Sequence, residues 1–239
     1  MDGTSAATRC SSPRAEDITV CYAVTHDAEW ARRAAASAYS AARANPGIHI
    51  RIAEVDGGDY PEGIWPEVLP GPECGTPWVL MLDADTWVNG RLEDIFKAGF
   101  GGLYLRVSSA WTGGKIDHQK WHRILEFFGL PLVPVWSNGL ILCRWPHSKA
   151  LRDELAFWQE RIPRCGLPDP LMRFKDKPEW WMRDQFALAA IISNHYWPVC
   201  ELSARQWSWD WKDEPPGIVH HVGKTDPFGD ELWPRFKTA

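Results

Sequence analysis

Short apolar runs of strand length alternate along this chain with longer segments of helix-forming residues. The predicted strands are 18–24, 48–55, 78–82, 102–107, 135–143, 196–202 and 217–222. The predicted helices are 28–44, 91–98, 115–128, 147–162 and 179–193, with a short one near 64–69. Because strands that alternate with helices are joined by right-handed crossovers, the pattern predicts an α/β fold with a mostly parallel central sheet flanked by helices.

The segment 78–82, WVLML, gives the clearest strand signal. It is a continuous apolar run between Pro77 and a pair of aspartates, which is typical of a strand buried on both faces of a sheet. The segment 28–44 is rich in alanine and arginine, and Asn45-Pro46-Gly47 ends it as a helix.

The chain has 239 residues without an internal repeat or a low-complexity linker, so we expect one domain over 17–239. Residues 1–16 are small and polar, and we expect them to form a disordered tail. No apolar run approaches the roughly 20 residues that span a bilayer, and the first ten lack a signal-peptide core. These features predict a cytoplasmic protein without a transmembrane segment.

The charge and the cysteines narrow the possible functions. A formal net charge of -5 argues against binding to nucleic acid, which requires a basic surface. The six cysteines form no C-x-x-C pair and have no zinc-ligand spacing, so we expect reduced structural thiols.

Two aspartates, Asp83 and Asp85, follow the buried strand directly. In open α/β sheets, ligands bind beyond the carboxyl ends of the strands, and two close carboxylates need a cation to offset their repulsion. Oxygen ligands select Mg²⁺ or Mn²⁺, and a diphosphate can complete the coordination shell. The alternative is that one aspartate caps the next helix. Because both acids stand at a buried strand's end, we favour the metal.

The segment VLMLDADTWVNGRLEDIF, residues 79–96, resembles the D-x-D region of GT-A fold glycosyltransferases, in particular family eight, the glycogenin and lipopolysaccharide galactosyltransferase type. The resemblance implies a GT-A fold in which Asp83 and Asp85 bind Mn²⁺ and, through it, the diphosphate of a nucleotide sugar. It also implies transfer of a hexose from a UDP-sugar to an acceptor hydroxyl with retention of configuration.

The C-terminal segment GIVHHVGKTDPFG, residues 217–229, is similar to the end of that family. The resemblance makes His220 the third metal ligand and places Gly223 near the diphosphate. The family's lysine is replaced by Asp226, so Lys224 is the candidate to contact the diphosphate instead. In a strand, His220 and His221 point to opposite faces, and only one of them need reach the site. The alternative is a pair of surface or core histidines.

The helix EWWMRDQFALAAIIS, residues 179–193, places two polar residues on the apolar stripe that includes Trp181. The resemblance assigns this pair, Asp184 and Gln185, to the transferred sugar as the candidate catalytic residues. A structural ion pair between Asp184 and an arginine is the alternative.

Two loops complete the candidate donor site. By resemblance, Thr25 and Asp27, with Trp30 one position displaced, approach the nucleotide, and Asn138 approaches the sugar hydroxyls. Helix capping by Thr25 or Asp27 is the alternative.

Tryptophan is unusually frequent, with 16 residues, and three of them alternate at 207, 209 and 211. In a strand, all three would face one side and form a stacking platform for an acceptor. The acceptor could be a sugar, a lipid-linked glycan, a natural product or a protein. Burial in the core or in a homodimer contact is the preferred interpretation.

Three other functions remain possible at this point. A haloacid-dehalogenase-type phosphatase also carries a D-x-D after a strand, but position 87 is Trp where that motif has Thr or Val. A non-catalytic sugar-binding module would explain the tryptophans. A nucleotidyltransferase of related fold would consume a nucleoside triphosphate.

Overall fold

The computed structural model describes residues 12–24, 28–54, 75–99, 101–112, 114, 117–145, 147–161, 183–195, 197–208 and 217–222. Several predictions lie outside the described residues: most of the tail, the short helix near 64–69, Thr25, Asp27, Trp209, Trp211, Gly223 and Lys224.

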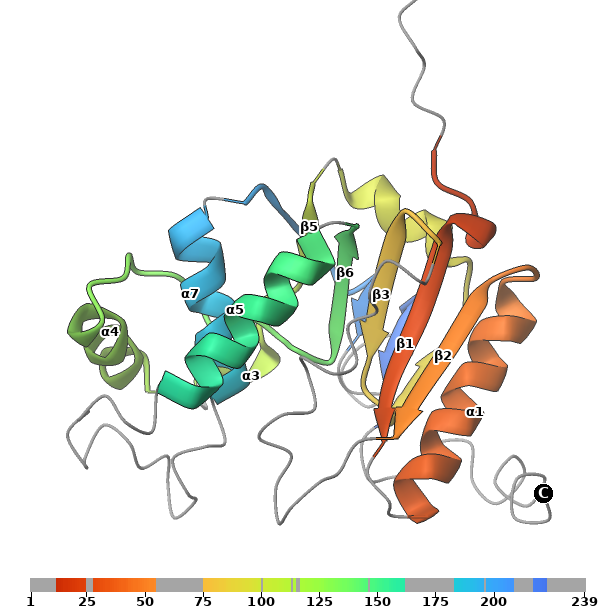
Figure 1. The fold of residues 1–239 in the computed structure, drawn as a ribbon, viewed down its shortest axis with the longest axis horizontal. Coiled ribbons are helices and arrows are strands. Elements are labelled where there is room, and N and C mark those ends of the chain that lie inside the picture. Colours follow the sequence, from red (N-terminus) through yellow and green to blue (C-terminus); the bar gives the residue numbers. More distant parts are fainter. Residues whose placement is uncertain are drawn as a thin grey trace, which may run out of the picture.

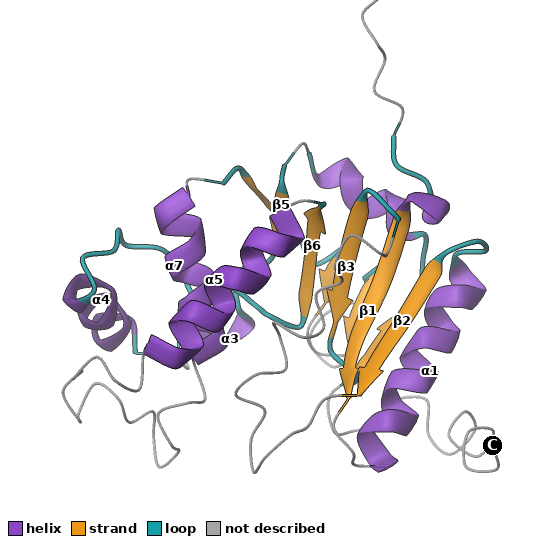
Figure 2. Cartoon of the chain, in the orientation of Figure 1, coloured by secondary structure: helices purple, strands orange, loops and turns teal. Residues whose placement is uncertain are grey.

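The central element is a six-stranded sheet (Figures 1 and 2). Its strands, in the spatial order β2-β1-β3-β6-β5-β7, are β2 (His49–Glu54), β1 (Ile18–Val24), β3 (Trp78–Leu82), β6 (Leu140–Arg144), β5 (Leu103–Leu105) and β7 (Val199–Glu201). β1 is parallel to β2 and β3, and β5 is parallel to β7, whereas β6 runs antiparallel to both neighbours. The sheet is therefore mixed, because β6 runs opposite to its other five strands.

A second, three-stranded sheet has the order β4-β9-β8. Its strands are β4 (Thr86–Val88), β9 (Val219–His221) and β8 (Trp207–Ser208). The sequence predicts β9, within the longer segment 217–222, but not β4 or β8. This sheet joins the segment after the two aspartates to the C-terminal histidines.

Apolar side chains of the large sheet alternate between two clusters on its opposite faces, as for Leu80 and Met81 of β3. One cluster includes side chains of α1 (Ala28–Ala44), the 3₁₀ helix η3 (Leu92–Ala98) and the small sheet. The other includes side chains of α4 (His118–Phe127), α5 (His147–Arg161) and α7 (Arg183–His195). In Figure 1, α1 lies beside β2, and these three helices lie together at the other side of the view. A short helix α3 (Ser109–Thr112) and the 3₁₀ turn η1 (Ala15–Asp17) complete the elements. No helix in the described part of the chain is long and apolar enough to cross a membrane.

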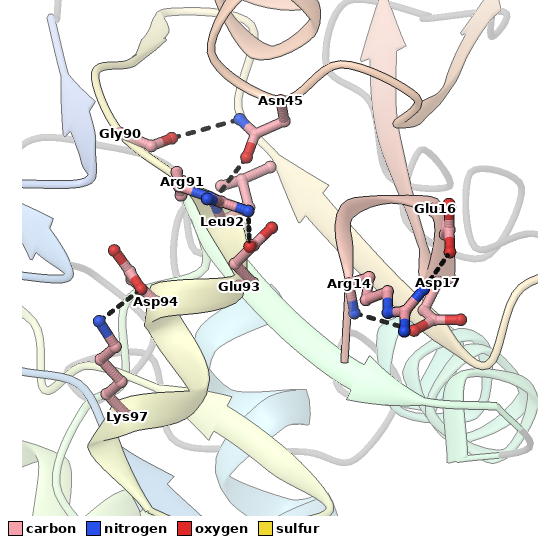
Figure 3. A network of polar contacts seen from close by, with 10 residues as sticks. All are labelled: Arg14, Glu16, Asp17, Asn45, Gly90, Arg91, Leu92, Glu93, Asp94 and Lys97. Atoms are coloured by element: carbon pink, nitrogen blue, oxygen red, sulfur yellow. Dashed lines mark hydrogen bonds and ion pairs between the residues drawn. The ribbon is translucent and has the colours of Figure 1, made fainter. Parts of the chain in front are cut away.

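Buried Asn45 ends α1 and joins it to the chain after β4 (Figure 3). Its Nδ2 donates to Gly90 O at 3.2 Å, and its Oδ1 accepts from Leu92 N at 2.7 Å. Two serines one and two turns earlier on α1 also contact β4: Ser40 Oγ accepts from Val88 N at 2.9 Å, and Ser37 Oγ lies 2.8 Å from Thr86 Oγ1. A row of buried polar contacts therefore holds β4 in register along α1.

Candidate metal centre

The two aspartates lie at the carboxyl end of β3, where the large and small sheets meet. Asp83 N donates to Gly139 O at 3.0 Å, which extends the pairing of β3 and β6 by one residue. Thr86 Oγ1 donates to Asp83 O at 2.8 Å and closes a turn between β3 and β4. Both acidic side chains are half-buried, as the strand-end position predicts.

His221 reaches these acids because β9 pairs antiparallel with β4. In the register of this pairing His221 lies opposite Thr86, and Val222 N donates to Asp85 O at 2.8 Å. His221 Nε2 lies 3.3 Å from Asp85 Oδ2, with both side chains largely buried. A residue more than 130 positions away in sequence is thereby held against the D-x-D segment.

His220, the predicted third ligand, points away from the two aspartates. It is completely buried, and its Nδ1 lies 2.6 Å from the hydroxyl of Ser208, which also accepts from Gly217 N at 2.7 Å. Neighbouring residues of a strand point to opposite faces, so a shift of one position exchanges the two histidines. The structure therefore brings His221, and not His220, close to the two aspartates.

Asp83, Asp85 and His221 lie close enough together to hold a divalent cation after a small adjustment. One ligand atom from each lies within 4.8 Å of the other two. Around an octahedral ion with ligands at about 2.1 Å, donor atoms are about 3 to 4.2 Å apart, so little adjustment is needed. Carboxylate oxygens suit Mg²⁺ and Mn²⁺, while an imidazole nitrogen shifts the preference towards transition metals.

The electrostatics of Asp85 favour an ionised carboxylate. Burial alone would raise the pKa of Asp85, but the hydrogen bond and charge of His221 outweigh it. The Asp85 backbone amide and the more distant charge of Arg33 act in the same direction, so the pKa of Asp85 lies below its ordinary value.

Gly139 allows Asp83 to occupy its position. A Cβ atom at Gly139 would lie 2.8 Å from Asp83 Oδ2 and 3.0 Å from Cζ2 of Trp207. Trp207 is held from the other side by Arg106, whose Nη1 donates to its carbonyl at 2.5 Å. Trp207 of β8 is buried in the core, which agrees with the preferred interpretation of this residue and not with an exposed acceptor platform.

The remaining predicted site residues are placed as follows. Trp30 is half-buried on α1, with Arg33 Cζ at 5.1 Å from its ring centroid. Asn138 is half-buried and directly precedes Gly139, whose carbonyl accepts from Asp83 N. Asp184 and Gln185 lie in the first turn of α7, where Gln185 is half-buried.

The comparisons with solved structures identify the class of fold. Its mixed α/β sheet, with the acidic pair at the end of β3, has the GT-A architecture that the sequence predicts. No protein-family model and no curated protein sequence matches the chain.

Three solved structures illustrate the likeness, all at low identity. The galactosyltransferase LgtC, solved in complex with donor and acceptor sugar analogs, is 16% identical over 92% of this chain and 94% of its own, with a TM-score of 0.53. A glycosyltransferase involved in glycosylation of the major capsid of PBCV-1 is 11% identical over 95% of this chain and all of its own, also with a TM-score of 0.53. GlyE of Streptococcus pneumoniae is 14% identical over 93% of this chain but 60% of its own, with a TM-score of 0.50. The resemblance to glycosyltransferases is thus confirmed at the level of the fold.

Proposed function

We propose that this protein is a metal-dependent glycosyltransferase that transfers a hexose from a nucleotide-diphosphate sugar, a UDP-sugar, to an acceptor hydroxyl with retention. The observation that carries the proposal is the cluster of Asp83, Asp85 and His221 at the end of β3. It supports the proposal because the same fold serves LgtC, a galactosyltransferase with donor and acceptor sugar analogs bound.

In this proposal Asp83, Asp85 and His221 hold Mn²⁺ or Mg²⁺ by their facing ligand atoms. The bound ion supplies positive charge that stabilises the diphosphate leaving group. Thr25, Asp27 and Trp30 bind the nucleotide, Gly223 and Lys224 contact the diphosphate, and Asn138 binds the sugar. Asp184 and Gln185 face the transferred sugar and stabilise its developing positive charge.

The proposal is tested by a thermal-shift panel of UDP- and GDP-sugars with and without Mn²⁺. A ligand that binds only the folded state stabilises it, by about 2.7 kcal/mol at about 100 times Kd. We expect one nucleotide sugar to raise Tm only when metal is present, and Asp85→Asn to abolish the rise. Asp94→Asn is the control, because Asp94 is an acid on η3 that pairs with Lys97. A rise without metal, or an equal rise in Asp85→Asn, would contradict the proposal.

Product analysis separates the proposed reaction from its rivals. Release of UDP from the donor, accelerated by an acceptor, indicates sugar transfer, and binding without turnover indicates a sugar-binding module. Pyrophosphate release from a nucleoside triphosphate indicates a nucleotidyltransferase. The phosphatase is disfavoured because the fold is that of glycosyltransferases.

A further inference from the structure

The segment that leads to the acidic cluster contains no basic residue. Between Arg51 and Arg91 the sequence has eight aspartates and glutamates but neither lysine nor arginine. The charges of Asp83 and Asp85 balance one divalent cation, so the negative charge of a bound diphosphate would remain uncompensated by this segment. Any positive group that adds to Lys224 in offsetting this charge comes from another element of the fold.

Helix α1 brings one arginine to this position. Ser37 of α1 contacts Thr86, which directly follows Asp85, at 2.8 Å between hydroxyl oxygens. Arg33 lies four residues before Ser37 and hence on the same face of the helix, one turn closer to its N-terminus. The side chain of Arg33 is only 13% exposed, although a surface arginine of a helix ordinarily extends into solvent.

Two neighbours on α1 orient the guanidinium of Arg33. Its Nη2 lies 2.5 Å from Glu29 Oε1, and its Cζ lies 5.1 Å from the centroid of the Trp30 ring. A guanidinium has five N–H donors in one plane, so it can keep an ion pair while it binds a phosphate.

We propose that Arg33 is the basic residue that α1 contributes to binding the diphosphate of the donor nucleotide. This inference rests on the proposed function and adds a residue and a specificity to it. Arg33 selects nucleoside diphosphates over monophosphates, because it lies on the face of α1 that contacts Thr86, the residue directly after Asp85. Arginine suits this role since its planar donors match two phosphate oxygens at once.

The matched control is Arg32→Gln, because Arg32 is the neighbouring residue of α1 and is exposed. We would titrate the full-length wild type, Arg33→Gln, Arg33→Lys and Arg32→Gln with UDP, UMP and uridine, each with Mn²⁺, and repeat the series with guanine nucleotides. In Arg33→Gln we expect UDP or GDP to bind about 10- to 100-fold more weakly, the monophosphate less so, and the nucleoside unchanged. Arg33→Lys restores part of the affinity, and Arg32→Gln keeps it within about 2-fold.

A further variant separates phosphate binding from support of the helix. Glu29→Gln removes the partner of Arg33 but keeps the guanidinium, so the diphosphate affinity should stay within about 3-fold. The Tm of each ligand-free variant verifies that it is folded. If Glu29→Gln weakens binding as strongly as Arg33→Gln, the arginine acts through the helix and the inference is wrong.

The two proposals fail in different ways. If the wild type binds a metal–diphosphate complex but Arg33→Gln and Arg32→Gln behave alike, only the role of Arg33 is wrong. The same conclusion follows if Arg33→Gln weakens the nucleoside as much as the diphosphate. If the wild type binds no nucleotide with metal, the proposed function and this inference both fall.

Discussion

Both sides of the large sheet bury aromatic rings, but they differ in their buried polar contacts. On the side of α1, buried hydroxyl and amide groups connect the helix to β4 and the chain after it, through Ser37, Ser40 and Asn45. On the side of α4, α5 and α7, aromatic rings pack in edge-to-face and tilted pairs. Phe186 has ring-centroid distances of 6.2 Å to Trp121, 4.7 Å to Phe128 and 5.6 Å to Trp158.

This difference corresponds to the different tasks of the two sides. Hydrogen bonds depend on distance and angle, so the polar contacts of α1 set the register of β4 and the positions of Asp83 and Asp85. Burial of aromatic surface is largely non-directional and contributes stability rather than precision. The metal centre lies beside the hydrogen-bonded side, where its geometry can be maintained.

The largest effect should come from the acids themselves. Asp85→Asn removes an ionised ligand of the metal. Loss of a residue that only supports a metal ligand lowers activity by about 10- to 100-fold, so loss of the ligand itself should lower donor turnover by more. Excess EDTA should have the same effect on the wild type, and added Mn²⁺ should reverse it. UDP release measures both effects, and activity that survives EDTA would show that no metal is needed.

A mutation on the aromatic side should affect stability rather than the site. Phe186→Ala opens a cavity among three rings and should lower the free energy of unfolding by about 3 to 5 kcal/mol. Phe157→Ala is the control, since Phe157 is 49% exposed, and should cost less than about 1 kcal/mol. Chemical denaturation measures both. A selective loss of nucleotide affinity in folded Phe186→Ala would contradict the separation of the two sides.

The paired histidines sharpen the comparison within one strand. His221→Ala should abolish the metal-dependent thermal shift while the ligand-free protein loses about 1 kcal/mol or less. His220→Ala removes a buried group that pairs with Ser208 and should cost about 2 to 4 kcal/mol, with the metal response retained at lower temperature. The opposite outcome would restore His220 as the third ligand.

The smallest effect on metal binding is expected from loss of the hydrogen bonds at the end of α1. Asn45→Ala leaves Leu92 N and Gly90 O without their side-chain partner and should cost about 1 to 3 kcal/mol. Because β4 loses part of its support, Mn²⁺ affinity should also fall, by about 2- to 5-fold. Lys149→Met, which removes only an exposed pair with Asp153, is the control. An Asn45→Ala variant with unchanged metal affinity would show that β4 holds its register without α1.

Much of the fold follows from local sequence patterns. The predicted bounds of β1, β3 and α1 agree with the structure, because long apolar runs and a stop at Asn45-Pro46-Gly47 are signals within one segment. The reversed direction of β6 is different, since an apolar run has the same pattern in either orientation. The two short strands β4 and β8 also carry no periodic signal.

The candidate site likewise has some features that one segment of sequence predicts and others that depend on the tertiary structure. By itself, the sequence determined that two carboxylates follow a buried strand, because hydrophobicity and residue type are properties of one segment. Only the tertiary structure decided that His221 faces them, since the pairing of β9 with β4 sets which side of a strand each residue occupies. It likewise brought Ser37 of α1 against Thr86, because helix packing joins residues that no sequence spacing relates.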